Sequence, residues 1–203
     1  MAEVIIVPEG GLRRDIRVEA GQRTDLVLAV MPGVSCDVAL DVTLAGEGAE
    51  ANIYGAYICG GEEKVKIGVN MHHDVPHCNS RQLFKGIAGG NSRVDFYGKI
   101  IVAPDAQRTE AYQENHNILL SDDARVDTKP QLEIYADDVK CSHGATIGRL
   151  NEEEQFYMRS RGITLEDAKV LQMISFLAPV LEAIPEAERE SMAAQIETAI
   201  RNI

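Results

Sequence analysis

The sequence predicts a mainly β chain that ends in a small α-helical unit. Short apolar or alternating runs, broken by glycine, proline and aspartate, continue from Glu3 to about Tyr135. Parts of this region also resemble one another. After Arg149 the apolar residues instead recur with helical spacing. We therefore expect a β core over residues 1–149 and a helical domain over residues 150–203.

Several runs in the first part have the composition of strands, and alternation with a period of two is clearest in ALDVTL and RVDFYGKI. No helical stretch of convincing length interrupts them. The expected strands are EVIIV, TDLVLAV, VALDVTL, ANIYGAYI, KVKIGVNM, RVDFYGKIIV and LEIYA.

A weak internal repeat relates residues 44–58 to residues 87–101, with Gly55 falling on Gly98. A third copy, residues 119–135, shares the opening apolar residue, the polar turn and the alternating strand. The first two copies lie 43 residues apart, which suits two coils of about 20 residues each in a stacked β-solenoid. A β-sandwich with similar turn chemistry is the alternative, and composition alone does not separate the two.

Two start signals mark the helical unit. Asn151 provides a cap oxygen, and Glu154 provides a carboxylate that can bond back to the cap. Gly162 then ends this first helix. Thr164 with Asp167 repeats the signal for a second helix.

The second helix is expected from Leu165 to about Ala183, although Pro179 should end or kink it. Pro185 opens a third helix, Glu186 to Asn202. Helices this short need a surface to cover their apolar faces, either the β region or another protein. The expected apolar faces contain Ala168, Leu171, Ile174, Phe176, Leu177, Val180, Leu181, Met192, Ile196, Ala199 and Ile200.

The net charge of −12 and the pI near 4.8 argue against a nucleic-acid or anionic-membrane partner. The chain contains no apolar run long enough to span a membrane, and MAEVIIVPEGG does not resemble a signal peptide. The four cysteines are scattered, without a CxxC pair, so we expect free thiols and a cytoplasmic location.

The stretch YADDVKCSHGATIGRL holds the first candidate site, Cys141 and His143. On a strand, residues two apart share a face, so sulfur and imidazole would lie side by side. This donor pair suits iron or zinc, although two ligands do not complete a site. The alternative is a buried cysteine beside a surface histidine.

MHHDVPHCNSR contains a second group of possible ligands: His72, His73, His77 and Cys78. Their spacing fits no closed zinc pattern, and a solvated loop is the more typical interpretation. His116 is a lone histidine on a probable strand. The sequence contains no Walker loop, GxSxG or HExxH, and no self-sufficient catalytic group, so we expect no enzymatic activity.

Residues 80–163 carry a family resemblance, which is most specific in the blocks TKPQLEIYADDVKCSHGAT and FYMRSRGI. They resemble the core of the SufB/SufD family, the scaffold subunits of the Suf iron–sulfur cluster assembly machinery. The resemblance extends from about residue 40 onward. It implies a right-handed parallel β-helix, or β-solenoid, followed by a C-terminal helical domain.

The resemblance also implies partners. In the family, the helical domain docks onto SufC, an ABC-type ATPase, which places that contact at about residues 150–185 here. The β-helix of SufD pairs with that of SufB, here through its C-terminal end, and a transient Fe–S cluster or iron is held at the interface. No intrinsic cofactor is implied. KCSHGAT places the family's cysteine and histidine at Cys141 and His143, with His143 the better candidate ligand.

Two positions favour a SufD-type chain. SufB-type members carry a cysteine near Asn115 and a glutamate at the position of Gly144. Family members are typically about twice as long, so the chain is either a short member or a fragment. The alternatives are a homodimeric scaffold that works with the ATPase alone, and a purely structural subunit without a ligand role. A carbohydrate-active β-helix would need paired carboxylates, which the sequence does not show.

Overall fold

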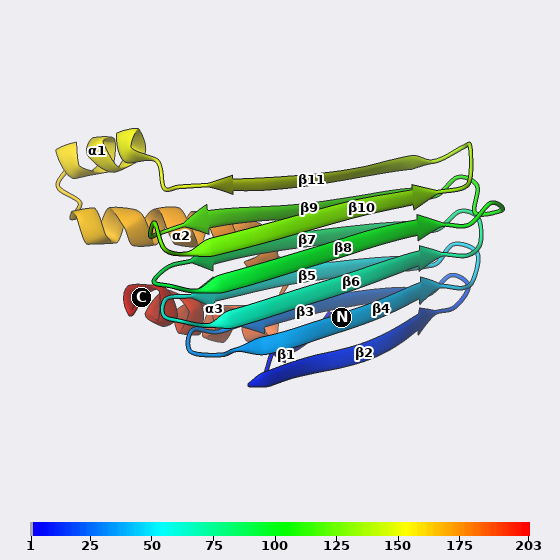
Figure 1. The fold of residues 1–203 in the computed structure, drawn as a ribbon, viewed down its shortest axis with the longest axis horizontal. Coiled ribbons are helices and arrows are strands. Elements are labelled where there is room, and N and C mark those ends of the chain that lie inside the picture. The colour runs from blue at the N-terminus through cyan, green and yellow to red at the C-terminus, as the bar shows by residue number, and fades with distance from the viewer. Residues whose placement is uncertain (1) are drawn as a thin grey trace.

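The computed structural model describes residues 2–203, which form a β-solenoid of about five turns followed by three helices (Figure 1). Successive strands alternate between two sheets, and all pairs are parallel. This arrangement confirms the β-solenoid and rules out the β-sandwich. Sheet A contains β1 (Glu3–Ile6), β3 (Arg23–Val30), β5 (Glu50–Cys59), β7 (Asn79–Ala88), β9 (Glu110–Leu119) and β11 (Lys140–Gly148), and sheet B contains β2 (Gly10–Val18), β4 (Cys36–Leu44), β6 (Lys64–His73), β8 (Arg93–Val102) and β10 (Arg125–Ile134).

One coil is longer than the internal repeat indicates. The register pairs Lys64 with Arg93 and Arg93 with Arg125, so these successive coils are offset by 29 and 32 residues. The expectation of two 20-residue coils within 43 residues is therefore wrong. The repeated stretches lie about one and a half coils apart, with Gly55 in sheet A and Gly98 in sheet B. They resemble each other because both strands alternate in the same phase about a central inward-facing glycine.

Glycine at these two positions makes room for large side chains between the sheets. A Cβ atom on Gly55 would lie 2.3 Å from Cδ1 of Phe84, and one on Gly98 would lie 2.1 Å from Nε2 of Gln113. The Phe84 ring also packs obliquely against Phe96 of the opposite sheet, with the ring centroids 5.0 Å apart. Apolar area buried in this way stabilises the fold by about 25 cal/mol per Å².

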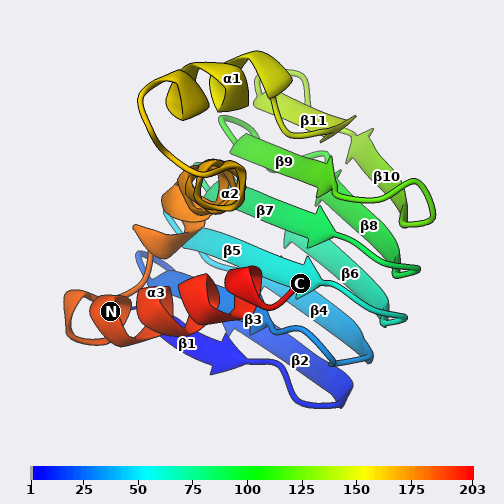
Figure 2. The same ribbon diagram turned by 90° about the vertical axis from the view of Figure 1, so that its left-hand side faces the viewer.

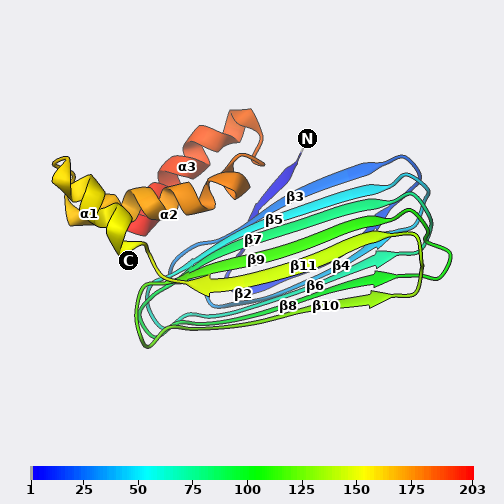
Figure 3. The same ribbon diagram turned by 90° about the horizontal axis from the view of Figure 1, so that it is seen from above.

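A second apolar core joins the helices to the outer face of sheet A (Figures 2 and 3). α2 (Leu165–Leu181) and α3 (Glu186–Arg201) lie on this face, whereas α1 (Glu152–Ser160) lies beyond the ends of the strands. The β region therefore covers the apolar faces of α2 and α3. The buried members of this core are Val27, Ala29, Ala56, Ile58, Leu83, Ile87, Val170, Met173, Leu177, Val180, Leu181, Ile184, Met192, Ile196 and Ile200.

The start of α1 agrees with its sequence signal only in part. The Asn151 side chain caps the helix by accepting hydrogen bonds from the backbone N–H groups of Glu153 and Glu154. The Glu154 carboxylate does not return a bond to the cap. It accepts instead from Nε2 of Gln172, on α2, at 2.7 Å. The carboxylate thus joins two helices, which local sequence alone does not encode.

α2 differs from its predicted form in two details. It ends at Leu181, two residues after Pro179, which lacks an N–H to bond the carbonyl four residues earlier and so weakens the last turn. Leu171 was expected on the apolar face but is 48% exposed. The exposed position of Leu171 leaves apolar surface on the side of α2 that faces α1.

The two ends of the solenoid differ in chemistry. In the first coil, Glu3 and Arg14 are aligned with buried residues and form an ion pair of 2.9 Å. At the other end, β10 and β11 are the edge strands of the two sheets (Figure 1). Their inward-facing side chains are half-buried or exposed, because no further coil covers them. Within residues 2–203, none of the helices has the length and apolarity that a membrane span requires.

Candidate functional site

Cys141 and His143 lie on β11, at the open edge of sheet A. The register places Cys141 beside Ala111 and His143 beside Gln113, and both of these β9 residues are buried inside the solenoid. Since residues two apart on a strand share a face, Cys141 and His143 both lie on the inward-facing side of the sheet. The structure therefore brings the two predicted site residues together on one face.

The two side chains differ in exposure. Cys141 packs against the main core and is half-buried, whereas His143 is exposed. Burial raises the pKa of the Cys141 thiol, and a hydrogen bond with the Ala111 backbone offsets only part of this effect. A raised pKa lowers the fraction of thiolate, which is the form that binds metals. His143 is therefore the more available donor.

Sulfur and imidazole nitrogen are donors that iron accepts. An iron in a tetrahedral sulfur and nitrogen environment needs four ligands, but Cys141 and His143 supply at most two. Within residues 2–203, no group of three or more His, Cys, Asp or Glu side chains is placed to hold a metal ion. The pair alone therefore does not complete a metal site.

The second predicted cluster does not converge. His72 faces outward from β6, and its Nε2 lies 3.0 Å from Oδ1 of Asp41. His73 is fully buried between the sheets, where its Nε2 shares a 2.8 Å hydrogen bond with Oγ of Ser80. Burial, and to a lesser extent the neighbouring His72, lower the pKa of His73 to about 4.

The remaining members of that cluster have other partners. His77 adopts a positive φ of 61° in a turn, with its Nε2 3.9 Å from Oε1 of Glu47. Cys78 is buried, and its thiol donates to the Gly46 carbonyl at 3.3 Å. His116 lies on the outer face of β9, where its Nδ1 shares a 2.8 Å hydrogen bond with a threonine hydroxyl. The expectation of a solvated loop is therefore wrong for half of this cluster, because His72 and His73 lie on β6, and His73 and Cys78 are buried.

Polar side chains fill part of the solenoid interior next to the open edge. Gln82, Gln113 and His143 are aligned on β7, β9 and β11. Gln82 and Gln113 are buried, and Nε2 of Gln113 donates to Oε1 of Gln82 at 2.9 Å. The exposed histidine therefore continues a row of buried amides.

A second polar group lies further along β9, where Asn115 and Asn117 meet Tyr57 of β5. The Tyr57 hydroxyl donates to Oδ1 of Asn117 and accepts from Nδ2 of Asn115 at 3.0 Å. Nδ2 of Asn117 donates to Oδ1 of Asn115 at 2.8 Å. Burial raises the pKa of Tyr57, so the phenol stays neutral. The expected strands do not include this network, although the alternating amides of QENHN are a signal for it in the sequence.

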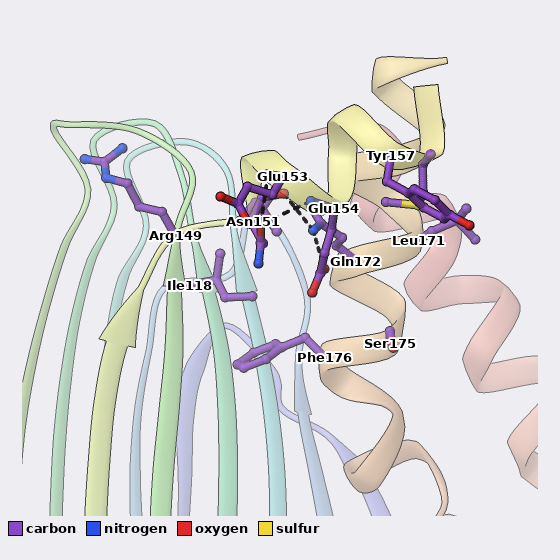
Figure 4. A pocket seen from close by; sticks show the side chains of 12 residues that line it. Ile118, Arg149, Asn151, Glu153, Glu154, Tyr157, Leu171, Gln172, Ser175 and Phe176 are labelled. Carbon is purple, nitrogen blue, oxygen red and sulfur yellow. Dashed lines mark hydrogen bonds between the residues drawn. The ribbon is translucent and has the colours of Figure 1, made fainter. Parts of the chain in front are cut away.

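A groove of about 1040 Å³ runs between α1, α2 and the edge of sheet A (Figure 4). Ile118 of β9 and Phe176 of α2 line it from the solenoid side. Nε2 of Gln172 holds α1 to α2 by donating to the Asn151 carbonyl at 3.0 Å and to Glu154.

Two aromatic side chains on α1 remain uncovered, and one of them, Tyr157, lines this groove. Phe156 is 72% exposed and Tyr157 is 59% exposed. Figure 4 places Tyr157 next to the exposed Leu171 of α2. Large exposed apolar groups that lie close together mark protein interaction surfaces more often than singly exposed ones.

Comparisons with known proteins identify a matching family. Residues 13–176 match the family described as "SUF system FeS cluster assembly, SufBD core domain". The iron-sulfur cluster assembly protein SufD of Escherichia coli (strain K12) is 48% identical over 127 residues, which are 62% of this chain and 30% of that protein. An iron-sulfur cluster assembly SufBD family protein of Synechocystis is 45% identical over 120 residues, 59% of this chain and 26% of the relative.

A SufBD family protein of Mycobacterium leprae matches a longer region, with 31% identity over 181 residues that cover 84% of this chain and 46% of the relative. This chain thus spans between about a quarter and a half of the length of these curated relatives. The family match includes most of the solenoid, the Cys141 and His143 strand, and α1 with most of α2. The chain belongs to the SufBD family of the SUF iron–sulfur cluster assembly system.

Proposed function

We propose that this chain is a SufD-type scaffold subunit of iron–sulfur cluster assembly, without catalytic activity of its own. The observation that carries this proposal is the open edge of β11. At that edge, one histidine and one cysteine lie on the inward-facing side of the strand, and no further coil within residues 2–203 covers them. The nascent cluster or iron is the cargo of this site, and His143 is its ligand from this chain.

The SufD assignment rests on the position of Asn115 and on the family relatives. Asn115 is fully buried, and its amide is engaged with Tyr57 and Asn117. It is therefore a structural residue and contributes no ligand. Within the described residues no third His, Cys, Asp or Glu joins Cys141 and His143 in a possible metal site, so a second subunit completes the ligand set.

The partner at this edge is a SufB-like solenoid. The edge strands β10 and β11 carry backbone groups that another strand can pair with. Apolar side chains surround this edge: Ile134, Tyr135 and Ile147 are 38%, 62% and 45% exposed. A second copy of this chain is the other possible occupant, and the subunit composition of the purified complex decides between them.

The exposed surface of α1 is the proposed docking site for a SufC-type ATPase, within residues 150–185. The β region already covers α2 and α3, so Phe156 and Tyr157 need a partner from outside this chain. In protein interfaces, truncation of a central aromatic residue typically costs 2 kcal/mol or more, or about thirtyfold in affinity. The cytoplasmic location stays a prediction.

The ligand role is tested by anaerobic cluster reconstitution of the complete complex with iron and sulfide. His143→Ala should leave the fold intact and lower the cluster yield measured by visible absorption. His116→Ala is the matched control, because His116 lies on the neighbouring strand but on the outer face. An unchanged yield in His143→Ala would show that this histidine is no ligand and favour a purely structural subunit.

The docking role is tested by titrating the ATPase against the scaffold. Phe156→Ala and Tyr157→Ala should each weaken binding by about thirtyfold without a change in melting temperature. Tyr97→Ala is the control, because Tyr97 is 37% exposed on sheet B, far in sequence from the helices. Equal affinities for all three variants would place the ATPase elsewhere.

A further inference from the structure

His143 occupies the last position in a row that runs through the solenoid. The parallel register aligns Ile53, Gln82, Gln113 and His143 on four successive strands of sheet A. Gln82 is 0% exposed and Gln113 is 1% exposed, whereas His143 lies in the open. The row therefore begins at an apolar residue, passes through two buried amides and ends at the candidate ligand.

The hydrogen bonds in this row have a direction. Gln113 uses its Nε2 to donate to Gln82, toward the earlier coil. Its Oε1 is buried and has no hydrogen-bond partner within residues 2–203. An unsatisfied buried acceptor costs about 1–3 kcal/mol, so a donor that can reach it gains from binding there.

The position of the Gln113 amide is fixed from the opposite sheet. Its side chain extends over Gly98 of β8, where a Cβ atom would lie within 2.8 Å of Oε1. The residue aligned with Gln113 on the following strand is His143. His143 is exposed and its ring makes no hydrogen bond within residues 2–203, so a rotation of this side chain can turn its N–H group toward Gln113.

Building on the proposed ligand role of His143, we propose that Gln113 is a positioning residue for it. Oε1 of Gln113 accepts a hydrogen bond from Nδ1–H of His143. A neutral imidazole has one N–H and one nitrogen with a lone pair. The hydrogen bond from Nδ1–H therefore leaves the lone pair of Nε2 free to bind a metal. Nδ1 adjoins the ring carbon nearest the strand, and Nε2 lies farther out, toward the subunit that completes the site.

The physical benefit is a fixed tautomer and a fixed ring orientation. Histidine ligands in proteins generally donate their second ring N–H to a carbonyl or carboxylate, and loss of that partner costs about 10–100-fold in metal affinity or activity. A carbonyl that accepts a hydrogen bond from Nδ1–H also makes Nε2 more basic and so a better metal ligand. A buried amide can thus set the ligand geometry at the open edge before a partner arrives.

The test reads the tautomer directly, without a bound cluster. The full chain is labelled with ¹⁵N-histidine and examined by long-range ¹H–¹⁵N correlation above the usual histidine pKa of about 6.5. His143 is assigned by the loss of its signals in His143→Ala. We expect wild-type His143 to be held as the Nδ1–H tautomer. Wild-type His143 found mainly as the Nε2–H form, or averaged between the two forms, would overturn the proposal.

Matched variants then identify the acceptor. Gln113→Met keeps the side-chain length but removes the carbonyl, and should shift His143 toward the Nε2–H form. Gln113→Glu keeps an acceptor oxygen and should preserve Nδ1–H. Asn115→Leu is the control, because it removes an equally buried amide that bonds Tyr57 and not Gln113. A shift in Asn115→Leu as large as in Gln113→Met would contradict the assignment.

The tautomer and the ligand role can fail separately. In the reconstituted complex, Gln113→Met should reduce the cluster yield about tenfold, and Gln113→Glu should retain most of it. If His143→Ala leaves the yield unchanged while the tautomer result holds, the ligand role fails and the hydrogen bond stands. If Gln113→Met does not fold, the wild-type tautomer and Gln113→Glu still decide the proposal.

Discussion

Glu63 lies in the turn between β5 and β6 and joins two successive coils. Its Oε1 accepts hydrogen bonds from the backbone N–H groups of Gly33 at 2.8 Å and Gly60 at 3.2 Å. Its Oε2 accepts from the backbone N–H of Gly61 at 2.7 Å. Gly33 belongs to the turn of the preceding coil, and Gly60 lies against the C-terminal Ile203. One carboxylate therefore connects two successive turns, each of which follows a strand of sheet A.

Glu63→Gln tests this connection with little change in shape. The amide oxygen can replace one carboxylate oxygen, but the amide NH₂ then opposes a backbone N–H. Hydrogen bonds to a charged group contribute about 1.5–3 kcal/mol each, against about 0.5–1.5 for neutral ones. Loss of the charge and of one acceptor should therefore lower the free energy of unfolding by about 2–3 kcal/mol at neutral pH.

The effect has a defined dependence on pH. Burial alone would raise the pKa of the Glu63 carboxyl, but the backbone hydrogen bonds, led by that of Gly33, lower it overall. A carboxyl whose pKa is lowered by folding stabilises the protein above its unfolded pKa of about 4.3. This contribution is lost as the pH falls through the lower folded-state pKa. The difference between wild type and Glu63→Gln should shrink in the same window.

Urea unfolding followed by circular dichroism measures both effects. Glu62→Gln is the matched control, because Glu62 is adjacent but exposed. If Glu63→Gln is as stable as Glu62→Gln at neutral pH, the carboxylate does not stabilise the two turns. A deficit of Glu63→Gln that stays constant on acidification would contradict the lowered pKa of Glu63.

Three further changes test the solenoid interior. Gly86→Ala would place a Cβ atom against the Tyr57 ring, and we expect a loss of about 3 kcal/mol in thermal unfolding, whereas Gly144→Ala meets nothing within 4 Å and should be near neutral. Tyr57→Phe removes the hydroxyl shared with Asn117 and should cost about 1–3 kcal/mol in urea unfolding, and no loss would contradict the network. Burial, and to a lesser extent His72, lower the pKa of His73 to about 4. Between about pH 6.5 and pH 4 the unfolded state therefore binds more protons than the folded state, and the free energy of unfolding decreases as the pH is lowered. A His73→Gln variant should lose this slope in pH-dependent melting curves.

The sequence predicts the fold wherever strands alternate apolar and polar residues. VALDVTL, KVKIGVNM and RVDFYGKIIV correspond closely to β4, β6 and β8. It does not predict β7 and β9, because Gln82, Gln113 and Asn115 place amides at inward positions and remove the alternation. β2 is missed for a similar reason, since Arg14 occupies one of its inward positions.

The site could be predicted only as far as local spacing reaches. Residues two apart on a strand share a face whatever the fold, which is enough to pair Cys141 with His143. Their location at an uncovered edge depends on the number of coils. The alignment of Gln113 with His143 depends on a register between strands 30 residues apart, which neither segment specifies alone. The exposure of Phe156 likewise depends on how α1 leaves the solenoid.

The polar interior has a consequence for assembly precision. Coils with purely apolar interiors can slide by two residues and still bury the same kind of surface. Here, a slip would separate Gln113 from Gln82 and Asn115 from Tyr57, and would leave several buried groups without partners. Each amide contact therefore helps to fix the register of the coil that follows. The last coil therefore has one register, which fixes the place of His143 along the edge strand.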